Sequence, residues 1–106
     1  MFFPVCINIE RKKCLVIGGG KIAYKKIKTL SRYNPDISVI AEEVKEEKIW
    51  GIKNIKVTEK RYSNEDLREY MIVVAATDDE ELNGEIADFC IENNILVNNV
   101  TSKDKM

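Results

Sequence analysis

The 106-residue sequence contains no histidine. This absence excludes Ser-His-Asp and Cys-His nucleophile systems and the usual zinc sites. It also removes the one side chain whose ordinary pKa, about 6.5, suits proton transfer near neutral pH. An enzyme whose bound cofactor carries the redox chemistry stays compatible with this composition.

Features of secreted, disulfide-linked and membrane-spanning proteins are also missing. The three cysteines, Cys6, Cys14 and Cys90, are odd in number and show no CxxC spacing, so we expect reduced thiols that fill the core. The first residues lack the charged region and long apolar run of a signal peptide, and no apolar run approaches the roughly 18 residues of a membrane span. These absences predict a cytoplasmic protein that does not enter a membrane.

Neither sign of charge dominates the chain. Lys and Arg number 17 and Asp and Glu number 18, which gives a formal net charge of -1. Binding of nucleic acid or anionic lipid requires a basic surface, so neither partner is expected. The 44% hydrophobic and 33% charged residues indicate one soluble domain that can bury a single core.

Apolar runs and amphipathic stretches alternate along the chain. The predicted strands cover residues 5–9, 14–17, 37–41, 55–60, 71–75 and 95–100. The predicted helices cover 21–31, then 63–70 behind a Ser63–Asp66 capping box, then the segment from a Thr77–Glu80 capping box to Asn93.

This order of elements predicts an α/β fold. We expect a Rossmann-like, doubly wound parallel sheet of about five strands with helices on both faces, plus a short N-terminal strand. No linker divides the chain, so residues 1–106 are expected to form one domain, the front part of a longer protein.

A glycine loop joins the strand at 14–17 to the first helix. Gly18, Gly20 and Ala23 form the pattern G-x-G-x-x-A, which permits a tight turn, a close approach of a pyrophosphate and close helix packing. The helix that follows offers free N–H groups and about half a positive charge to the phosphates. A plain strand-to-helix turn is the alternative explanation.

Two further segments fall where a dinucleotide would lie. Glu42 and Glu43 follow the strand at 37–41, about 20 residues beyond the glycine loop, as expected of an acceptor for a ribose 2′-hydroxyl. A carboxylate there repels the 2′-phosphate of NADP, so the predicted cofactor is NAD; alternatively, the pair only complements a helix dipole. Ala76 and Thr77 follow the strand at 71–75 and are predicted to lie beside the cofactor, although capping also explains Thr77.

Several segments together resemble the precorrin-2 dehydrogenase family, the NAD-binding part of siroheme synthases. These segments are C-L-V-I-G-G-G-K-I-A at 14–23, V-V-A-A-T-D-D-E-E-L-N at 73–83 and L-V-N-N-V at 96–100. The resemblance implies NAD-dependent oxidation of precorrin-2 to sirohydrochlorin, a step toward siroheme, for which this chain supplies the NAD-binding domain. The implied cofactor contacts are the glycine loop with Lys21 and Ile22, then Glu42 and Glu43, then Ala76 and Thr77.

The resemblance also implies a catalytic aspartate after the fifth strand. Thr101 stands at that place and Asp104 lies three residues further on, so both are candidate catalytic residues. A hydroxyl is no general base near neutral pH without an activating neighbour, and an exposed tail carboxylate is the alternative explanation of Asp104. The implied substrate is a polycarboxylate tetrapyrrole, yet no basic cluster is evident at the strand ends. The whole protein is implied to be a homodimer.

Two other functions stay open at this point. The first is a regulatory module that binds NAD or a nucleotide without turnover, like the cytoplasmic domains that gate potassium transporters. Those domains share the strand order, the glycine loop and the acidic residue. The second is a chain that folds and, by itself, binds only weakly.

Overall fold

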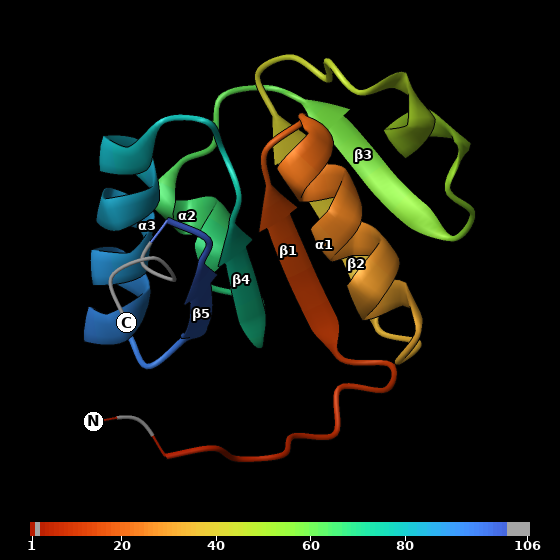
Figure 1. Ribbon diagram of the computed structural model, residues 1–106. Helices are drawn as coiled ribbons and strands as arrows, with labels where there is room; N and C mark the ends of the chain where they lie inside the picture. The colour runs from red at the N-terminus through yellow and green to blue at the C-terminus, as the bar shows by residue number, and fades with distance from the viewer. Residues whose placement is uncertain (2, 102–106) are drawn as a thin grey trace.

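The computed structural model describes residues 1 and 3–101, which contain one five-stranded sheet. The strands are β1 (Lys13–Ile17), β2 (Asp36–Ala41), β3 (Ile55–Glu59), β4 (Ile72–Ala75) and β5 (Leu96–Asn99). They lie in the order β3-β2-β1-β4-β5, and every neighbouring pair is parallel (Figure 1). This is the strand order of a doubly wound fold, so the predicted fold class is confirmed.

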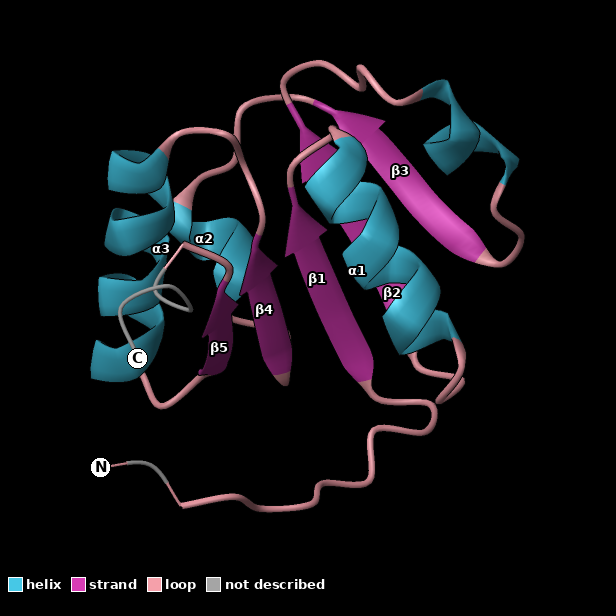
Figure 2. Cartoon of the chain, viewed as in Figure 1, coloured by secondary structure: helices cyan, strands magenta, loops and turns pink. Residues whose placement is uncertain are grey.

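Helices cover both faces of the sheet. They are α1 (Lys21–Ser31), the 3-10 helix η1 (Glu47–Gly51), α2 (Asn64–Leu67) and α3 (Glu80–Glu92). One face packs against α1 and η1, and the opposite face packs against α2 and α3 (Figures 1 and 2). Within the described residues, no helix has the length and apolar content that crossing a membrane requires.

The apolar run of β1 is continuous because the strand is central and both of its faces are covered. Val16 packs in the cluster beneath α1, whereas Leu15 and Ile17 pack in the cluster beneath α3. All three are at most 3% exposed. Because successive side chains of a strand point to opposite faces, this one apolar run contributes to both cores. The central position of β1 in the sheet places the end of this strand in the middle of the molecule.

The predicted N-terminal strand over 5–9 is wrong. The chain there runs across the end of the sheet at which the strands begin, and it pairs with none of them (Figure 1). Val5 and Ile7 are exposed, and only Ile9 is buried. A β-branched segment without a partner strand has no ladder of hydrogen bonds and does not form a strand. Cys6 in the same segment is exposed, which also corrects its expected place in the core.

The two capping predictions had different outcomes. The Asp66 carboxylate accepts a hydrogen bond from the Ser63 N–H at 2.8 Å, so that capping box is confirmed, although α2 ends at Leu67 instead of residue 70. Helix α3 starts later than predicted, because Asp79 caps it by accepting from the Leu82 N–H at 3.1 Å. Thr77 is therefore not the N-cap, and its hydroxyl serves another purpose, described below.

Candidate functional site

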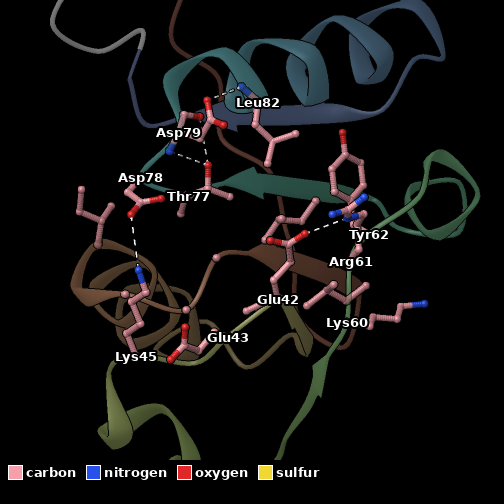
Figure 3. Close-up of a pocket in the computed structure, with 18 of the residues that line it drawn as sticks. Glu42, Glu43, Lys45, Lys60, Arg61, Tyr62, Thr77, Asp78, Asp79 and Leu82 are labelled. Carbon is pink, nitrogen blue, oxygen red and sulfur yellow. Dashed lines mark hydrogen bonds and ion pairs between the residues drawn. The ribbon is translucent and has the colours of Figure 1, made fainter.

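A groove of about 1200 Å³ runs along the edge of the sheet at which the strands end. Segments 17–22, 40–45, 60–64 and 76–82 contribute its lining, so the loops that follow β1, β2, β3 and β4 all contribute (Figure 3). The strand order reverses between β1 and β4, and ligands of open parallel sheets bind at this reversal. The groove therefore lies where the fold favours a ligand.

The backbone conformation and packing of the loop after β1 require a glycine at position 18. Its φ of +136° is a conformation that other residues rarely adopt. A Cβ atom at this position would lie 2.3 Å from the carbonyl oxygen of Ala76. The loops after β1 and β4 thus touch each other through their backbones, and only glycine permits the contact.

Gly19 and Gly20 differ in what surrounds them. A Cβ on Gly19 would lie 2.5 Å from the Glu43 carbonyl oxygen, because the loop after β2 packs against this residue. A Cβ on Gly20 would meet no heavy atom of the described chain within 4 Å. Gly20 therefore keeps open a space that the described part of the protein does not fill, and this is where the motif requires a close approach of a pyrophosphate.

The first turn of α1 is ready to receive an anion. Gly20 is its N-cap, and no side chain within the described residues caps the turn or adds an acidic group to it. The N–H groups of this turn carry the positive end of the helix dipole. Lys21 begins the helix and lines the groove together with Ile22, which is 51% exposed. The predicted Lys21 and Ile22 therefore lie at the groove, beside the glycine loop.

Glu42 and Glu43 both line the groove immediately after β2. Glu42 Oε1 accepts a hydrogen bond from Arg61 Nε at 2.9 Å, and the two carboxylates point in different directions in Figure 3. The first helix after β2 is η1, and its N-cap is Glu46. No helix therefore begins at the acidic pair. Complementing a helix dipole is therefore not the reason for these two carboxylates.

Ala76 and Thr77 line the groove next to the glycine loop. The Ala76 N–H donates to the Ile17 carbonyl at 2.9 Å and continues the β1–β4 ladder past the last paired residues. The Thr77 hydroxyl donates to Asn83 Oδ1 at 2.6 Å, and the Thr77 N–H donates to the same oxygen at 3.1 Å. Asn83, which is fully buried, thus fixes the Thr77 loop from α3.

Residues 5–106 match a family model described as "Putative NAD(P)-binding". The chain belongs to this NAD(P)-binding family. The groove, the open space at Gly20 and the uncapped first turn of α1 are the features through which such a domain holds a dinucleotide. The family membership agrees with the predicted use of NAD.

Curated relatives of the chain include siroheme synthases. The chain is 36% identical over 105 residues to the siroheme synthase of Ruthia magnifica subsp. Calyptogena magnifica, and 33% identical over 105 residues to that of Psychromonas ingrahamii. Each match covers 97% of this chain and 22% of the relative. The chain thus spans about a fifth of the length of these relatives.

Solved structures add a match in three dimensions. The chain is similar to "SirC, precorrin-2 dehydrogenase" with a TM-score of 0.79 and 32% identity, over 95% of this chain and half of that one. A shikimate dehydrogenase from Aquifex aeolicus, at 14% identity and a TM-score of 0.61 over 88% of this chain and 44% of that one, shows the fold alone. The resemblance to the precorrin-2 dehydrogenase family is thereby confirmed.

The sequence reasoning missed a set of basic side chains at this groove. Lys45, Lys60 and Arg61 line it together with Lys21, so the expectation of no basic cluster at the strand ends is wrong. Lys45 Nζ lies 4.0 Å from an Asp78 carboxylate oxygen across the groove (Figure 3). Each of these three residues follows a strand by one to four positions, so inspection of every strand end would have found them.

Tyr62 also lines the groove and was not predicted. Burial raises the pKa of its phenol, and the nearby Glu85 carboxylate and Cys90 raise it further. The phenol therefore stays protonated near neutral pH, where it can donate a hydrogen bond but cannot accept a proton as a base.

Of the two candidate catalytic residues, only Thr101 lies within the described part of the chain. Thr101 follows β5, and its hydroxyl donates to Asn99 Oδ1 at 2.7 Å. It is not among the residues that line the groove in the described part of the chain. Asp104 lies outside the described residues.

Proposed function

We propose that this chain is the NAD-binding domain of an enzyme that oxidises precorrin-2 to sirohydrochlorin in siroheme biosynthesis. The observation that carries the proposal is the similarity to a solved precorrin-2 dehydrogenase at 32% identity over 95% of this chain. The siroheme synthases among the curated relatives support the same pathway. The fold supplies the dinucleotide groove that this oxidation requires.

The chain's own residues account for cofactor binding. The pyrophosphate would lie in the open space beside Gly20 and would accept hydrogen bonds from the first-turn N–H groups of α1. The Glu42 carboxylate, held by Arg61, is the acceptor for the ribose hydroxyls. Ala76, the clamped Thr77, Lys21 and Ile22 line the groove around the glycine loop.

The reaction removes two electrons and two hydrogens from the substrate. When bound, NAD would supply the nicotinamide to which one of these hydrogens is transferred as a hydride. The second leaves as a proton and needs a base; the proposed base is Asp104, and Thr101 could serve only with a neighbouring group that activates its hydroxyl. The protein contributes mainly by holding donor and acceptor in a reactive orientation.

Four further predictions, about the whole protein or about this chain, belong to this proposal. They are a tetrapyrrole substrate, a homodimeric assembly, a cytoplasmic location and a single domain over residues 1–106. The cytoplasmic location is supported by three cysteines without a disulfide.

The proposal is tested in two steps. First, NAD is titrated into the chain by calorimetry, and we expect saturable binding to one site. Second, residues 5–106 replace the matching domain of the solved precorrin-2 dehydrogenase, and NADH formation with precorrin-2 is followed by absorbance under anaerobic conditions. Turnover by the folded chimera is expected. NAD binding without turnover in a chimera that folds would support the regulatory module instead.

A further inference from the structure

We propose that Arg61 can bind a 2′-phosphate and that Glu42 prevents this by neutralising the charge of Arg61. This one ion pair would then decide between NAD and NADP. The inference rests on the proposed function, because it assumes that a dinucleotide occupies the groove. It adds the residue that would bind NADP if Glu42 did not prevent it.

The pair joins two loops that are far apart in sequence. Glu42 follows β2 and Arg61 follows β3, and their side chains meet at 2.9 Å on the rim of the groove (Figure 3). Their side chains are 67% and 86% exposed. Ion pairs this exposed add little to folding stability, so stabilisation of the fold does not account for the Glu42–Arg61 pair.

The chemistry of both groups fits a choice at the ribose. An ionised carboxylate has about four acceptor positions, so Glu42 can accept from Arg61 and from a 2′-hydroxyl at the same time. A planar guanidinium matches the geometry of a phosphate and binds it through two parallel hydrogen bonds. Arg61 would therefore bind a 2′-phosphate once the Glu42 charge is removed.

The neighbouring cation is already engaged elsewhere. Lys60 Nζ donates to Asp66 Oδ1 at 2.9 Å, which ties it to the start of α2. Lys45, another cation of the groove, lies with its Nζ 4.0 Å from an Asp78 carboxylate oxygen. Arg61 is the cation that directly contacts the carboxylate expected at the ribose.

The test compares Kd values for NAD and NADP, measured by calorimetry on the full chain. The variants are Glu42→Gln, Glu42→Gln/Arg61→Gln and Glu42→Gln/Lys56→Gln. Lys56 is an exposed residue of β3 that does not line the groove, so the last two variants remove the same charge from different places. Glu47→Gln, on the exposed surface of η1, is the matched control for loss of one carboxylate.

We expect Glu42→Gln to bind NADP roughly tenfold more tightly than the unsubstituted chain does. The gain should persist with Lys56→Gln, disappear with Arg61→Gln and be absent in Glu47→Gln. Both residues of the pair are exposed, so circular dichroism should show all variants folded. Adenosine 2′-monophosphate, used as a smaller probe, should follow the same order.

The possible failures are distinguishable. If the unsubstituted chain binds neither dinucleotide, the proposed function is overturned. If it binds NAD and Glu42→Gln gains no affinity for NADP, this inference alone is overturned. A gain that survives Arg61→Gln would show that removal of repulsion is the whole effect, and would overturn the role of Arg61.

Discussion

The Asn83 side chain holds Thr77 from three sides. Asn83 Oδ1 accepts from the Thr77 N–H at 3.1 Å and from its hydroxyl at 2.6 Å, while Asn83 Nδ2 donates to the Thr77 carbonyl oxygen at 3.0 Å. Asn83 is fully buried, so water cannot replace these bonds. The loop that forms one wall of the groove is thereby fixed to α3 by a single amide.

Replacing this amide should cost stability. Asn83→Ala leaves the Thr77 N–H and carbonyl without their partner, and we expect a loss of about 2 kcal/mol in the free energy of unfolding. Urea denaturation measures the loss. Asn93→Ala, which removes an amide that is only partly buried at the end of α3, is the matched control and should cost less. Equal losses in the two variants would contradict the clamp.

The glycines of the loop should separate folding from binding. Gly20→Ala places its methyl group where no described atom lies within 4 Å, so we expect a stability change within about 0.5 kcal/mol and NAD affinity reduced roughly tenfold. Gly18→Ala combines a φ of +136° with a 2.3 Å contact to Ala76, and should lose about 3 kcal/mol or more. Thermal unfolding and NAD titration of both variants measure the difference. Normal NAD binding by Gly20→Ala would show that the pyrophosphate does not lie beside Gly20.

The three thiols should differ in reactivity. Cys6 is exposed, whereas Cys14 and Cys90 are buried. Burial raises the pKa of both buried thiols, and the Asp36 charge raises that of Cys14 further, so little reactive thiolate forms. We expect iodoacetamide to add one group to the native chain and three to the unfolded chain, as counted by mass spectrometry. Cys6→Ser should leave the native chain unmodified, and rapid labelling of Cys90 would contradict the packing beneath α3.

Acid should weaken the attachment of α2. The hydrogen bond from Lys60 lowers the pKa of Asp66 below its ordinary value of 3.8, with further help from the Ser63 N–H. A lowered pKa means that the ionised form is favoured in the folded state, so its contribution is complete above pH 3.8 and is lost as the pH falls through the folded value. Urea unfolding at a series of pH values measures this loss. Asp66→Asn should flatten the dependence, whereas Asp88→Asn, at an exposed position of α3, should keep it.

Much of this structure follows from patterns within single segments. The apolar runs of β1 and β4 and the helical periodicity of α1 predict bounds close to the observed ones, because burial on both faces leaves a clear mark on the sequence. The segment over 5–9 has the same apolar character, yet whether it becomes a strand depends on a partner. Sequence around 5–9 carries no information about that partner.

The candidate site divides in the same way. The glycine loop and the acidic pair are marked by their spacing, so the sequence alone locates Gly20 and Glu42. Arg61 and Asn83 act through contacts with residues 19 and 6 positions away, on other elements of the fold. Such contacts depend on how strands and helices are placed in space, which local patterns do not record.

The direct contact between Gly18 and Ala76 has a consequence for the lifetime of the protein. These residues lie on either side of the seam where β1 meets β4, and a dinucleotide bound there would bridge the two halves of the sheet. A ligand that binds only the folded chain stabilises it in proportion to the logarithm of its concentration. Cofactor supply would then govern how quickly proteases remove the chain, so a cell depleted of the dinucleotide would also lose the protein that uses it.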